Sequence, residues 1–411
     1  MEMTPGYKQT DAGVIPDDWD VKQLGELSSV SAGGTPSRSN ANYWGGDIPW
    51  ITTTEIDFRL ITESEQFITS IGLKNSAAKL MPAGALLMAL YGQGKTRGKV
   101  GVLGFEAATN QACAAIILKE GYSREYAFHY LASRYDEIRK LSNTGNQENL
   151  NGALVRSIPV LLPPLSEQSA IATALSDVDA LLSSLDALIA KKRDIKQAAM
   201  QQLLTGKTRL PGFEGEWTVK RLDQLANIRS GGTPSTTVSR FWDGGIPWCT
   251  PTDITRLGGG KYLLDTSRQI TSEGLSNSSA ELIPANSVVM TSRATIGECA
   301  INLKPVTTNQ GFKNFVPFED TEVNFLYYLL QTQKQGFIQL CAGSTFLEIG
   351  KTQLAAYKVH LPSTKAEQSA IAEVLSDMDA ELAALEDRCD KTRLLKQGMM
   401  QELLTGKTRL V

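Results

Sequence analysis

The sequence predicts an α+β protein in which two pseudo-symmetric mixed α/β domains are separated by two long helices that form an antiparallel coiled coil. Three observations support this prediction: an internal repeat, a heptad pattern in the best-matched part of the repeat, and strand-like segments elsewhere. Residues 167–210 and 367–410 are identical at 27 of 44 aligned positions, at a constant offset of 200. Such self-similarity indicates two copies of one structural unit.

The similarity continues upstream at lower density. The sequence Gly-Gly-Thr-Pro-Ser occurs at residues 33–37 and 231–235, and Thr-Asn-Gln occurs at residues 109–111 and 308–310. Each half is therefore a variable block of about 140 residues followed by a nearly constant block of about 45. Residues 15–24 resemble the start of the second half. Joining the last residue of the chain to the first would therefore produce a junction like the one between the two halves. Two equivalent halves related by a pseudo-twofold axis would have this property.

The constant blocks are predicted to be long helices of about 39 residues, or roughly 58 Å, that begin after Pro164 in the first copy. Apolar residues recur there in alternating steps of four and three, which is typical of a coiled-coil seam. The predicted seam consists of Ile171, Leu175, Val178, Leu182, Leu185 and Ile189, with Ile371, Leu375, Met378, Leu382 and Leu385 in the second copy. The register then reaches Lys192 and Lys196, and Thr392 and Lys396 in the second copy, where the seam should loosen. Gly206 and Gly406 should end the helices. The alternative is that each helix packs on its own domain, but two near-identical copies favour mutual antiparallel pairing.

The repeat predicts five segments. They are an N-terminal segment 1–18 that packs near the C-terminus, a first domain 19–162, a central helix and linker 163–216, a second domain 217–361, and a distal helix 362–411. Turn residues and apolar runs predict strands at 47–54, 85–91, 99–105, 246–252, 287–291 and 297–303. Helices are predicted at 124–141 and 323–338.

Composition excludes several classes of function. Of the 411 residues, 42% are hydrophobic and 21% charged, as in globular proteins. Only two histidines are present, His129 and His360, which disfavours histidine-based catalytic triads and multi-histidine metal sites. A structural role is expected for both histidines. Five scattered cysteines without a CxxC motif indicate neither disulfides nor a metal site, which fits a reducing cytoplasm. No secretory signal or membrane span is expected.

Motifs for nucleotide chemistry are also missing. Gly-Lys-Thr occurs four times, but the glycine that a phosphate-binding loop requires five residues earlier is absent each time. No glycine-rich loop with a downstream acidic residue indicates a dinucleotide fold. We therefore expect no catalytic residue, no metal ligand and no cofactor in this chain.

Several polar residues are candidates for contacts with nucleic acid. The loop at residues 91–98 holds two cations among glycines, and cations can neutralise phosphates or read guanine edges. The alternative for this loop is a solvated hairpin tip. The amides of the Thr-Asn-Gln segments could read an adenine edge or simply bond within a buried turn. The candidates are Arg38, Lys95, Arg97, Lys99, Asn110, Gln111, Arg240, Arg293, Asn309 and Gln310. Residues 19–162 carry 14 basic and 13 acidic residues, and residues 217–360 carry 13 and 11, so any such contact should be concentrated on one face.

At this point the chain resembles a known family, the specificity (S) subunits of type I restriction–modification enzymes. The resemblance rests on residues 162–168 (LPPLSEQ) with Ile171 and Ala172, and on the end of the helix from Lys196 to Leu210. The Gly-Gly-Thr-Pro-Ser and Thr-Asn-Gln segments also look like the family. The second copy departs from the pattern at residues 363–367 (STKAE), which affects only local geometry. The resemblance covers essentially the whole chain.

The resemblance implies a non-catalytic subunit with two target-recognition domains, each binding one half of a bipartite, asymmetric site on double-stranded DNA. It implies that the two helices form the spacer. It also implies docking of two modification (methyltransferase) subunits, which bind S-adenosylmethionine and methylate adenine, and of two restriction subunits, which use ATP, translocate and cut DNA. A cytoplasmic protein with a role in phage defence and no membrane partner is expected. The competing hypothesis is a coiled-coil adaptor whose globular domains bind protein or glycan, and the absent motifs oppose a stand-alone nuclease or methyltransferase.

Overall fold

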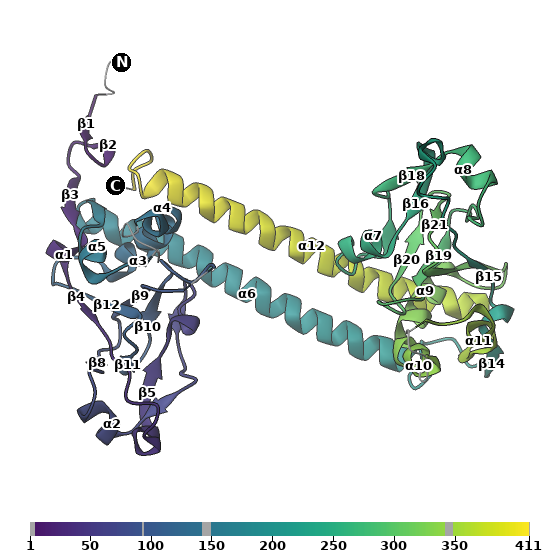
Figure 1. Ribbon diagram of the computed structural model, residues 1–411, viewed down its shortest axis with the longest axis horizontal. Helices are drawn as coiled ribbons and strands as arrows, with labels where there is room; N and C mark the ends of the chain where they lie inside the picture. Colours follow the sequence, from purple (N-terminus) through teal and green to yellow (C-terminus); the bar gives the residue numbers. More distant parts are fainter. Residues whose placement is uncertain (1–4, 93, 142–148, 342–347, 411) are drawn as a thin grey trace. The chain divides into compact units, whose positions relative to one another are not determined.

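The computed structural model describes residues 5–92, 94–141, 149–341 and 348–410. The predicted N-terminal segment, both predicted domains, the loop at 91–98 and the distal helix segment each include residues outside these ranges. The chain divides into two compact units (Figure 1). The first unit is Met1–Asp186 with Asp387–Val411, and the second unit is Ala187–Glu386. Each unit thus combines one variable block with part of each long helix.

The first unit is built on a five-stranded sheet in the order β4-β12-β9-β10-β6, in which β12 pairs antiparallel with both β4 and β9, and β10 pairs parallel with β6. Its strands are β4 (Ser28–Ala32), β6 (Leu60–Ile61), β9 (Leu86–Ala89), β10 (Val100–Leu103) and β12 (Cys113–Leu118). A second sheet has the order β7-β5-β11-β8. Its strands are β5 (Trp44–Ile51), β7 (Phe67–Ile68), β8 (Leu80–Met81) and β11 (Ala107–Thr109). Two short pairs complete the unit, β1 (Tyr7–Thr10) with β2 (Gly13–Pro16) and β3 (Asp20–Gln23) with β13 (Pro159–Leu162).

Strand β9 explains why the sequence shows a continuous apolar run here. Successive side chains of a strand point to opposite faces of the sheet. Leu86 and Met88 contribute to one hydrophobic core, and Leu87 and Ala89 contribute to another on the opposite face. A strand that is buried on both faces needs apolar residues at every position rather than an alternating pattern.

The helices of the first unit are short. They are α1 (Leu24–Leu27), α2 (Ser70–Lys74), α3 (Arg124–Ser133), α4 (Tyr135–Lys140) and α5 (Gly152–Arg156), with 3-10 turns η1 (Ala41–Tyr43) and η2 (Thr53–Glu55). The single helix predicted at 124–141 is therefore two helices. The backbone N–H of Arg134 donates to the carbonyls of both Tyr130 and Leu131 at 3.2 Å, which tightens and ends the first helix at that point.

The second unit repeats this arrangement with the strand order β15-β22-β19-β20-β17. The strands of this sheet are β15 (Ala226–Ser230), β17 (Tyr262–Leu263), β19 (Ser287–Thr291), β20 (Cys299–Asn302) and β22 (Phe312–Pro317). The smaller sheet is β18-β16-β21, formed by β16 (Trp242–Cys249), β18 (Arg268–Ile270) and β21 (Thr307–Thr308), and β14 (Trp217–Arg221) pairs with β23 (Lys358–Pro362). The matching strand orders confirm that the halves are structural duplicates.

The helices of the second unit also match those of the first. They are α7 (Pro251–Arg256), α8 (Ser272–Ser276), α9 (Val323–Thr332), α10 (Lys334–Leu340) and α11 (Lys351–Ala356), with 3-10 turns η3 (Leu222–Gln224) and η4 (Ser239–Phe241). The strand predicted at 246–252 is wrong at its end. Pro251 begins α7, where proline is favoured at the first helical position, and the Asp253 carboxylate accepts from the Thr250 N–H at 2.8 Å. The corresponding prediction at 47–54 fails in the same way, since η2 begins at Thr53.

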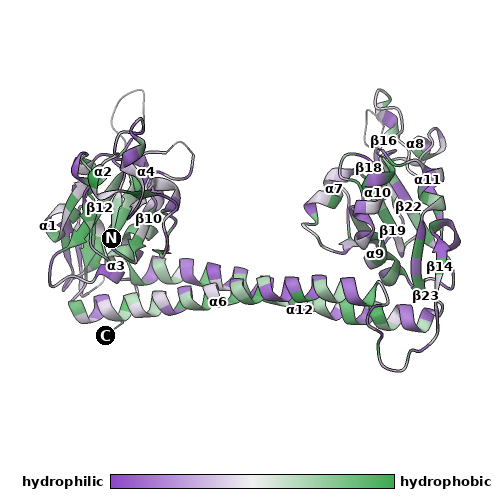
Figure 2. Ribbon diagram, turned by 90° about the horizontal axis from the view of Figure 1, so that it is seen from below, coloured by the Kyte–Doolittle hydropathy of each residue, from purple (hydrophilic) through white to green (hydrophobic). Residues whose placement is uncertain are grey.

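The two long helices are α6 (Leu165–Leu203) and α12 (Lys365–Leu403), each of 39 residues. In the first unit the start of α6 and the end of α12 share one core, which contains Ile171, Leu175 and Leu403. The second unit mirrors this with the start of α12 and the end of α6. Packing on the domain and antiparallel packing of one helix on the other therefore both occur, which confirms the fold class. Figure 2 shows apolar and hydrophilic residues interleaved along both helices.

The residues of the predicted seam are all buried or half-buried. Ile171, Leu175, Leu185, Ile189, Ile371, Leu375 and Leu382 are buried, and Val178, Leu182, Met378 and Leu385 are half-buried. At three of the four positions where the seam should loosen, lysines form ion pairs between the helices, whereas Thr392 is buried. In the second unit Lys192 pairs with Glu381 at 2.6 Å and Lys196 pairs with Asp379. In the first unit Lys396 pairs with Asp179 at 2.5 Å.

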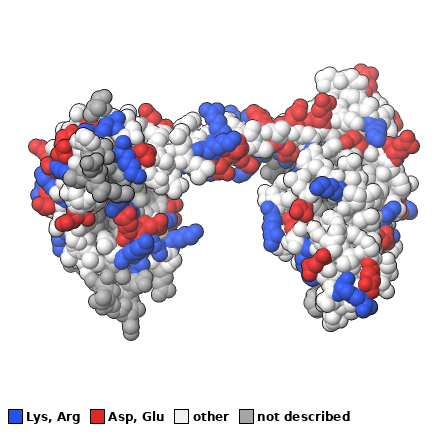
Figure 3. All heavy atoms as spheres, turned by 90° about the horizontal axis from the view of Figure 1, so that it is seen from above, with Lys and Arg blue, Asp and Glu red and all other residues white. Residues whose placement is uncertain are grey.

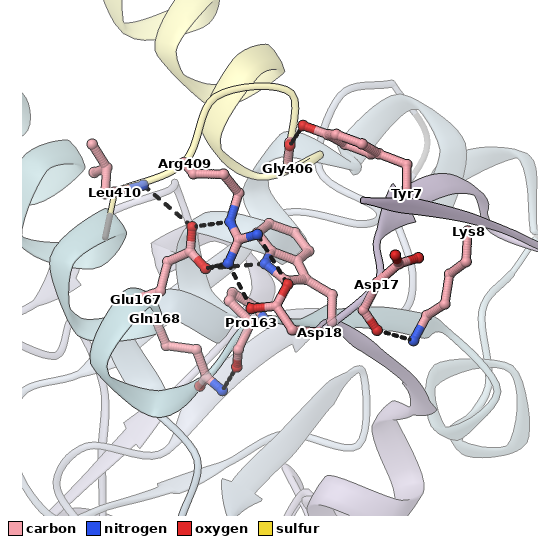
Figure 4. A network of polar contacts seen from close by, with 11 residues as sticks. Tyr7, Lys8, Asp17, Asp18, Pro163, Glu167, Gln168, Gly406, Arg409 and Leu410 are labelled. Carbon is pink, nitrogen blue, oxygen red and sulfur yellow. Dashed lines mark hydrogen bonds and ion pairs between the residues drawn. The ribbon is translucent and has the colours of Figure 1, made fainter. Parts of the chain in front are cut away.

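A glycine follows the C-terminal end of each long helix and lets the chain turn there. Gly206 and Gly406 have φ of +71° and +74°, as the predicted helix stops require. A Cβ at Gly406 would lie 2.5 Å from Cδ of Pro16, so the chain passes too close to the N-terminal segment for any other residue. The Tyr7 hydroxyl donates to the carbonyl of Gly406 at 3.0 Å. The N-terminal segment and the C-terminal tail are therefore in contact within the first unit (Figure 4).

Candidate nucleic-acid interface

Two tryptophans hold each Gly-Gly-Thr-Pro-Ser turn in place. In the first unit the Trp50 indole N–H donates to the carbonyl of Gly34 at 2.9 Å, and the Trp44 indole N–H donates to the carbonyl of Ser37 at 3.1 Å. The two rings meet edge to face, with centroids 5.0 Å apart. The outer ring, Trp44, is half-buried and the inner ring, Trp50, is buried.

The second unit reproduces this arrangement. Trp248 donates to the carbonyl of Gly232 and Trp242 donates to the carbonyl of Ser235, both at 3.0 Å. The ring centroids are 4.9 Å apart. The turn and its tryptophan pair are thus a shared scaffold of the two halves, which otherwise differ widely in sequence.

Glycine is required where each turn meets the Thr-Asn-Gln segment. A Cβ at Gly33 would lie 2.1 Å from the carbonyl oxygen of Thr109, and a Cβ at Gly231 would lie 1.9 Å from that of Asn309. The side chains of Thr35 and Gln111 are in hydrogen-bond contact. The two motifs identified from the sequence are therefore brought together in the fold.

The predicted asparagines bond within their own turns. The Asn110 side-chain oxygen accepts from the N–H of Ala112 at 3.0 Å, and the Asn309 oxygen accepts from the N–H of Gly311 at 2.9 Å. This arrangement agrees with the turn alternative. Gln111 and Gln310 each contact a turn threonine, Thr35 and Thr233 respectively. Base reading by any of the four amides stays a prediction.

The cations of the loop at 91–98 lie in different environments. Lys95 is exposed, whereas Arg97 is only 8% exposed and its guanidinium donates to the carbonyl of Arg139 at 3.1 Å. Lys99 pairs with Asp57 at 2.6 Å. Lys95 is therefore more accessible to a ligand than Arg97, which is buried, or Lys99, which is ion-paired. Gln93 of this loop lies outside the described residues.

The two predicted arginines of the second unit are ion-paired. Arg240 pairs with Glu273 at 2.7 Å, and Arg293 pairs with Glu348 at 2.9 Å. Arg293 follows β19 in the turn that leads to β20, and the neighbouring Ala294 has φ of +56°. A ligand phosphate would have to compete with these carboxylates.

Arg38 lies on the tryptophan scaffold. Its guanidinium carbon is 3.8 Å from the centroid of the Trp44 ring and 5.0 Å from that of Trp50, and its Nη2 donates to the Gln66 side chain at 2.8 Å. Arg240, the other candidate that follows a shared turn, does not occupy the equivalent position. Counting from the shared turns, Arg38 aligns with Thr236 and Arg240 aligns with Asn42.

The structural counterpart of Arg38 is Arg268, a residue that the sequence reasoning missed. Its guanidinium carbon lies 3.8 Å from the centroid of Trp242 and 5.3 Å from that of Trp248. Arg268 belongs to β18, opposite Trp248 in the strand register. The sequence held one usable signal, since the repeat aligns Gln66 with Arg268 and Gln66 is the partner of Arg38.

The described residues offer little for catalysis. The His129 side chain is 2% exposed, and its Nε2 lies 3.1 Å from the Ser176 hydroxyl. Burial lowers the pKa of His129 to about 4. Burial also raises the pKa of the Cys113, Cys249 and Cys299 thiols, which leaves them protonated and unreactive. Within the ranges that the structure describes, no group of three His, Cys, Asp or Glu side chains could hold a metal ion.

Charge is distributed without segregation by sign on the face drawn in Figure 3, where basic and acidic side chains are mixed on each unit. No broad basic surface is visible on this side of either unit. None of the helices that the structure describes is long and apolar enough to cross a bilayer.

Comparison with known proteins identifies the class of protein. The family model described as "Type I restriction modification DNA specificity domain" matches residues 16–192 and again residues 214–391. The chain therefore belongs to the type I restriction–modification specificity family, a family of non-catalytic DNA-specificity subunits, as its sequence motifs suggested.

Individual relatives agree with this assignment. The type I restriction enzyme MjaIX specificity subunit of Methanocaldococcus jannaschii is 36% identical over 166 residues, which is 40% of this chain and 38% of that relative. The putative MjaX specificity subunit of the same organism is 22% identical over 98% of this chain and 97% of its own length. The crystal structure of a type I S subunit from M. genitalium has the same fold, with a TM-score of 0.60, 15% identity, and coverage of 98% of this chain and 99% of that one.

Proposed function

We propose that this chain is the DNA sequence-recognition subunit of a type I restriction–modification complex and that it reads a bipartite, asymmetric site. Residues 19–162 would bind one half-site and residues 217–361 the other. The observation that carries the proposal is the duplicated scaffold of turn, tryptophan pair and Thr-Asn-Gln segment, embedded in domains of different sequence. A common frame with different surroundings suits two modules that bind one kind of ligand but read different base sequences.

The long helices are proposed to space the two half-sites. Their seams are buried within each unit, and their ends merge into the domain cores. When the end of a rigid helix is part of a domain core, a longer helix moves that domain further along the helix axis. The distance between recognition surfaces would then depend on helix length.

The helices also offer surface for partner subunits. In the first unit Leu394 and Leu395 on α12 are 68% and 60% exposed. Ile195 on α6, in the second unit, is 43% exposed. Large apolar residues exposed on a helix favour helix-in-groove contacts with another protein. We propose that two modification subunits dock here, supply S-adenosylmethionine-dependent methylation, and recruit two ATP-dependent restriction subunits in the cytoplasm.

The test is co-expression with the modification subunits followed by sequencing of modified bases, together with duplex binding by the purified chain at several salt concentrations. Methylation at one bipartite sequence and binding that weakens steeply with salt are expected. The chain alone should neither methylate nor cleave DNA. Absence of any salt-dependent DNA binding, both alone and in the complex, would instead favour the adaptor hypothesis.

A further inference from the structure

The two halves place a guanidinium group on the same tryptophan pair from different positions in the sequence. In the first unit the arginine is Arg38, on the turn, and the strand position beside it is Gln66. In the second unit the turn position is Thr236 and the strand position is Arg268. The sequence positions have exchanged, yet the distance from guanidinium to outer tryptophan is 3.8 Å in both units.

Both guanidinium groups are available to a ligand. Arg38 and Arg268 are exposed, and no carboxylate pairs with either of them among the residues that the structure describes. Arg240 and Arg293, by contrast, each have a glutamate partner. A cation over an aromatic face is held in place while N–H groups at its edge can still donate, which suits bonding to phosphate oxygens. In Arg38 one of these groups, Nη2, already donates to the neutral Gln66 side chain at 2.8 Å.

The tryptophans do not need these arginines for their structural role. Each indole already donates to a carbonyl of the turn. The arginine over the outer ring is therefore not needed to hold the turn. Because an arginine occupies this place in both units from different sequence positions, we infer that it contacts a ligand.

We propose that Arg38 and Arg268 are the phosphate anchors of the two recognition domains, each binding the DNA backbone next to its half-site. This inference rests on the proposed function. A feature that both halves share cannot specify base sequences that differ between them, so a backbone contact is favoured over base reading. The tryptophan pair sets the orientation of the cation, and the loops that differ between the halves read the bases.

The first experiment measures duplex affinity of the full chain against salt concentration for Arg38→Ala, Arg268→Ala and the double variant. Each lost phosphate contact lowers the slope of log K against log salt by about 0.9. Each single variant should therefore bind about eightfold more weakly at 0.1 M salt and about twofold more weakly at 0.5 M. Arg221→Ala is the matched control, because Arg221 is exposed but paired with Asp223 and is not among the candidate DNA contacts, so its slope should stay close to that of the wild type.

The second experiment exchanges the sequence positions. Arg38→Thr should weaken binding, and adding Gln66→Arg to it reproduces the pattern of the second unit and should restore both affinity and slope. Failure of this rescue would overturn the proposal, as would unchanged slopes in the alanine variants. A changed methylation sequence in the complex would also overturn it, in favour of base reading.

Thermal unfolding of each variant controls for damage to the fold, and Arg38→Lys, which keeps the charge, should retain most of the slope. If the wild type showed no salt-dependent binding to DNA, both alone and in the complex, the proposed function would fail and the phosphate anchors with it. If the wild type binds and the arginine variants match it, only the phosphate anchors are rejected.

Discussion

The guanidinium of Arg409 lies against the carboxylate of Glu167, with Nε to Oε1 and Nη2 to Oε2 both at 2.7 Å, across 242 residues of sequence. Figure 4 shows Asp18 on the other side of the same guanidinium, and the Trp19 indole N–H donates to Glu167 at 3.0 Å. The Glu167 side chain is 1% exposed. The C-terminal tail is thus fastened to the first unit by a buried, charge-assisted contact.

Loss of this contact should destabilise the first unit. Arg409→Ala leaves a buried carboxylate without its cation, which costs about 3 kcal/mol when the site cannot relax. Denaturant unfolding followed by tryptophan fluorescence measures the loss. Asp18→Asn is the milder control, since the Asp18 side chain is 52% exposed.

The second unit contains a matched pair. Arg209 and Glu367 are joined at 2.6 and 2.8 Å, and Trp217 donates to Glu367 at 3.2 Å. Arg209→Ala should therefore destabilise the second unit by a similar amount. Equal stability of wild type and both variants would show that these contacts contribute nothing to folding.

The first unit should lose stability in mild acid because of His129. Burial lowers the pKa of His129 from 6.5 to about 4, and the nearby charges are those of Asp179, Lys396 and Glu125. Between these two values the unfolded state binds a proton that the folded state does not, so stability is complete above about pH 6.5 and falls by roughly 2–3 kcal/mol towards pH 4. Unfolding free energies measured across this range test the prediction.

The repeat supplies a matched variant, because Tyr328 occupies the position equivalent to His129 in the second unit. His129→Tyr removes the titrating group and should flatten the loss of stability between pH 6.5 and 4. A variant with the same pH dependence as the wild type would assign the loss to other groups. Melting at pH 7.5 checks that the substitution is tolerated.

Two cations of one loop should behave differently when removed. Lys95→Ala should weaken DNA binding and lower its salt slope by up to about 0.9 without changing stability, because Lys95 is exposed. Arg97→Ala should lower the melting temperature, because the Arg97 side chain is buried and bonds to Arg139. Unchanged affinity for the Lys95 variant would support the solvated-hairpin alternative.

The first domain should be exchangeable as a block. Strands β3 and β13 lie at the two ends of residues 19–162 and pair with each other. Exchanging the whole block therefore replaces both strands and keeps their pairing. Replacing this block with that of a relative should alter one half-site in the methylation map and leave the other unchanged. A hybrid in which both half-sites change would contradict independent recognition.

The helices should act as a ruler. Seven residues inserted after Asp186 and seven after Glu386 preserve the heptad register and lengthen each helix by about 10 Å. The gap between half-sites should then grow by up to roughly three base pairs, with unchanged half-site sequences. Two-residue insertions at the same points rotate the apolar stripe by about 200° and should destabilise the pairing. An unchanged gap with full activity after the heptad insertion would refute the spacer role.

Local and periodic features of this protein are predictable from its sequence. The heptad steps from Ile171 to Ile189, the helix start after Pro164 and the stop at Gly206 each depend on residues a few positions apart. The repeat then doubles every such prediction. Family membership follows from the same features, because the motifs lie in the helix segments and in short turns.

Only the tertiary structure decides which side chains meet across long stretches of chain. Arg268 reaches Trp242 from another strand, Arg97 is covered by Arg139, and Arg409 finds Glu167 from the opposite end of the sequence. The protonation of His129 likewise depends on what buries it. Residue type limits what a side chain can do, but its burial and its partners decide what it does. Burial and partners arise from packing between segments that are far apart in the sequence, and nothing in the spacing of these segments indicates that they will be in contact.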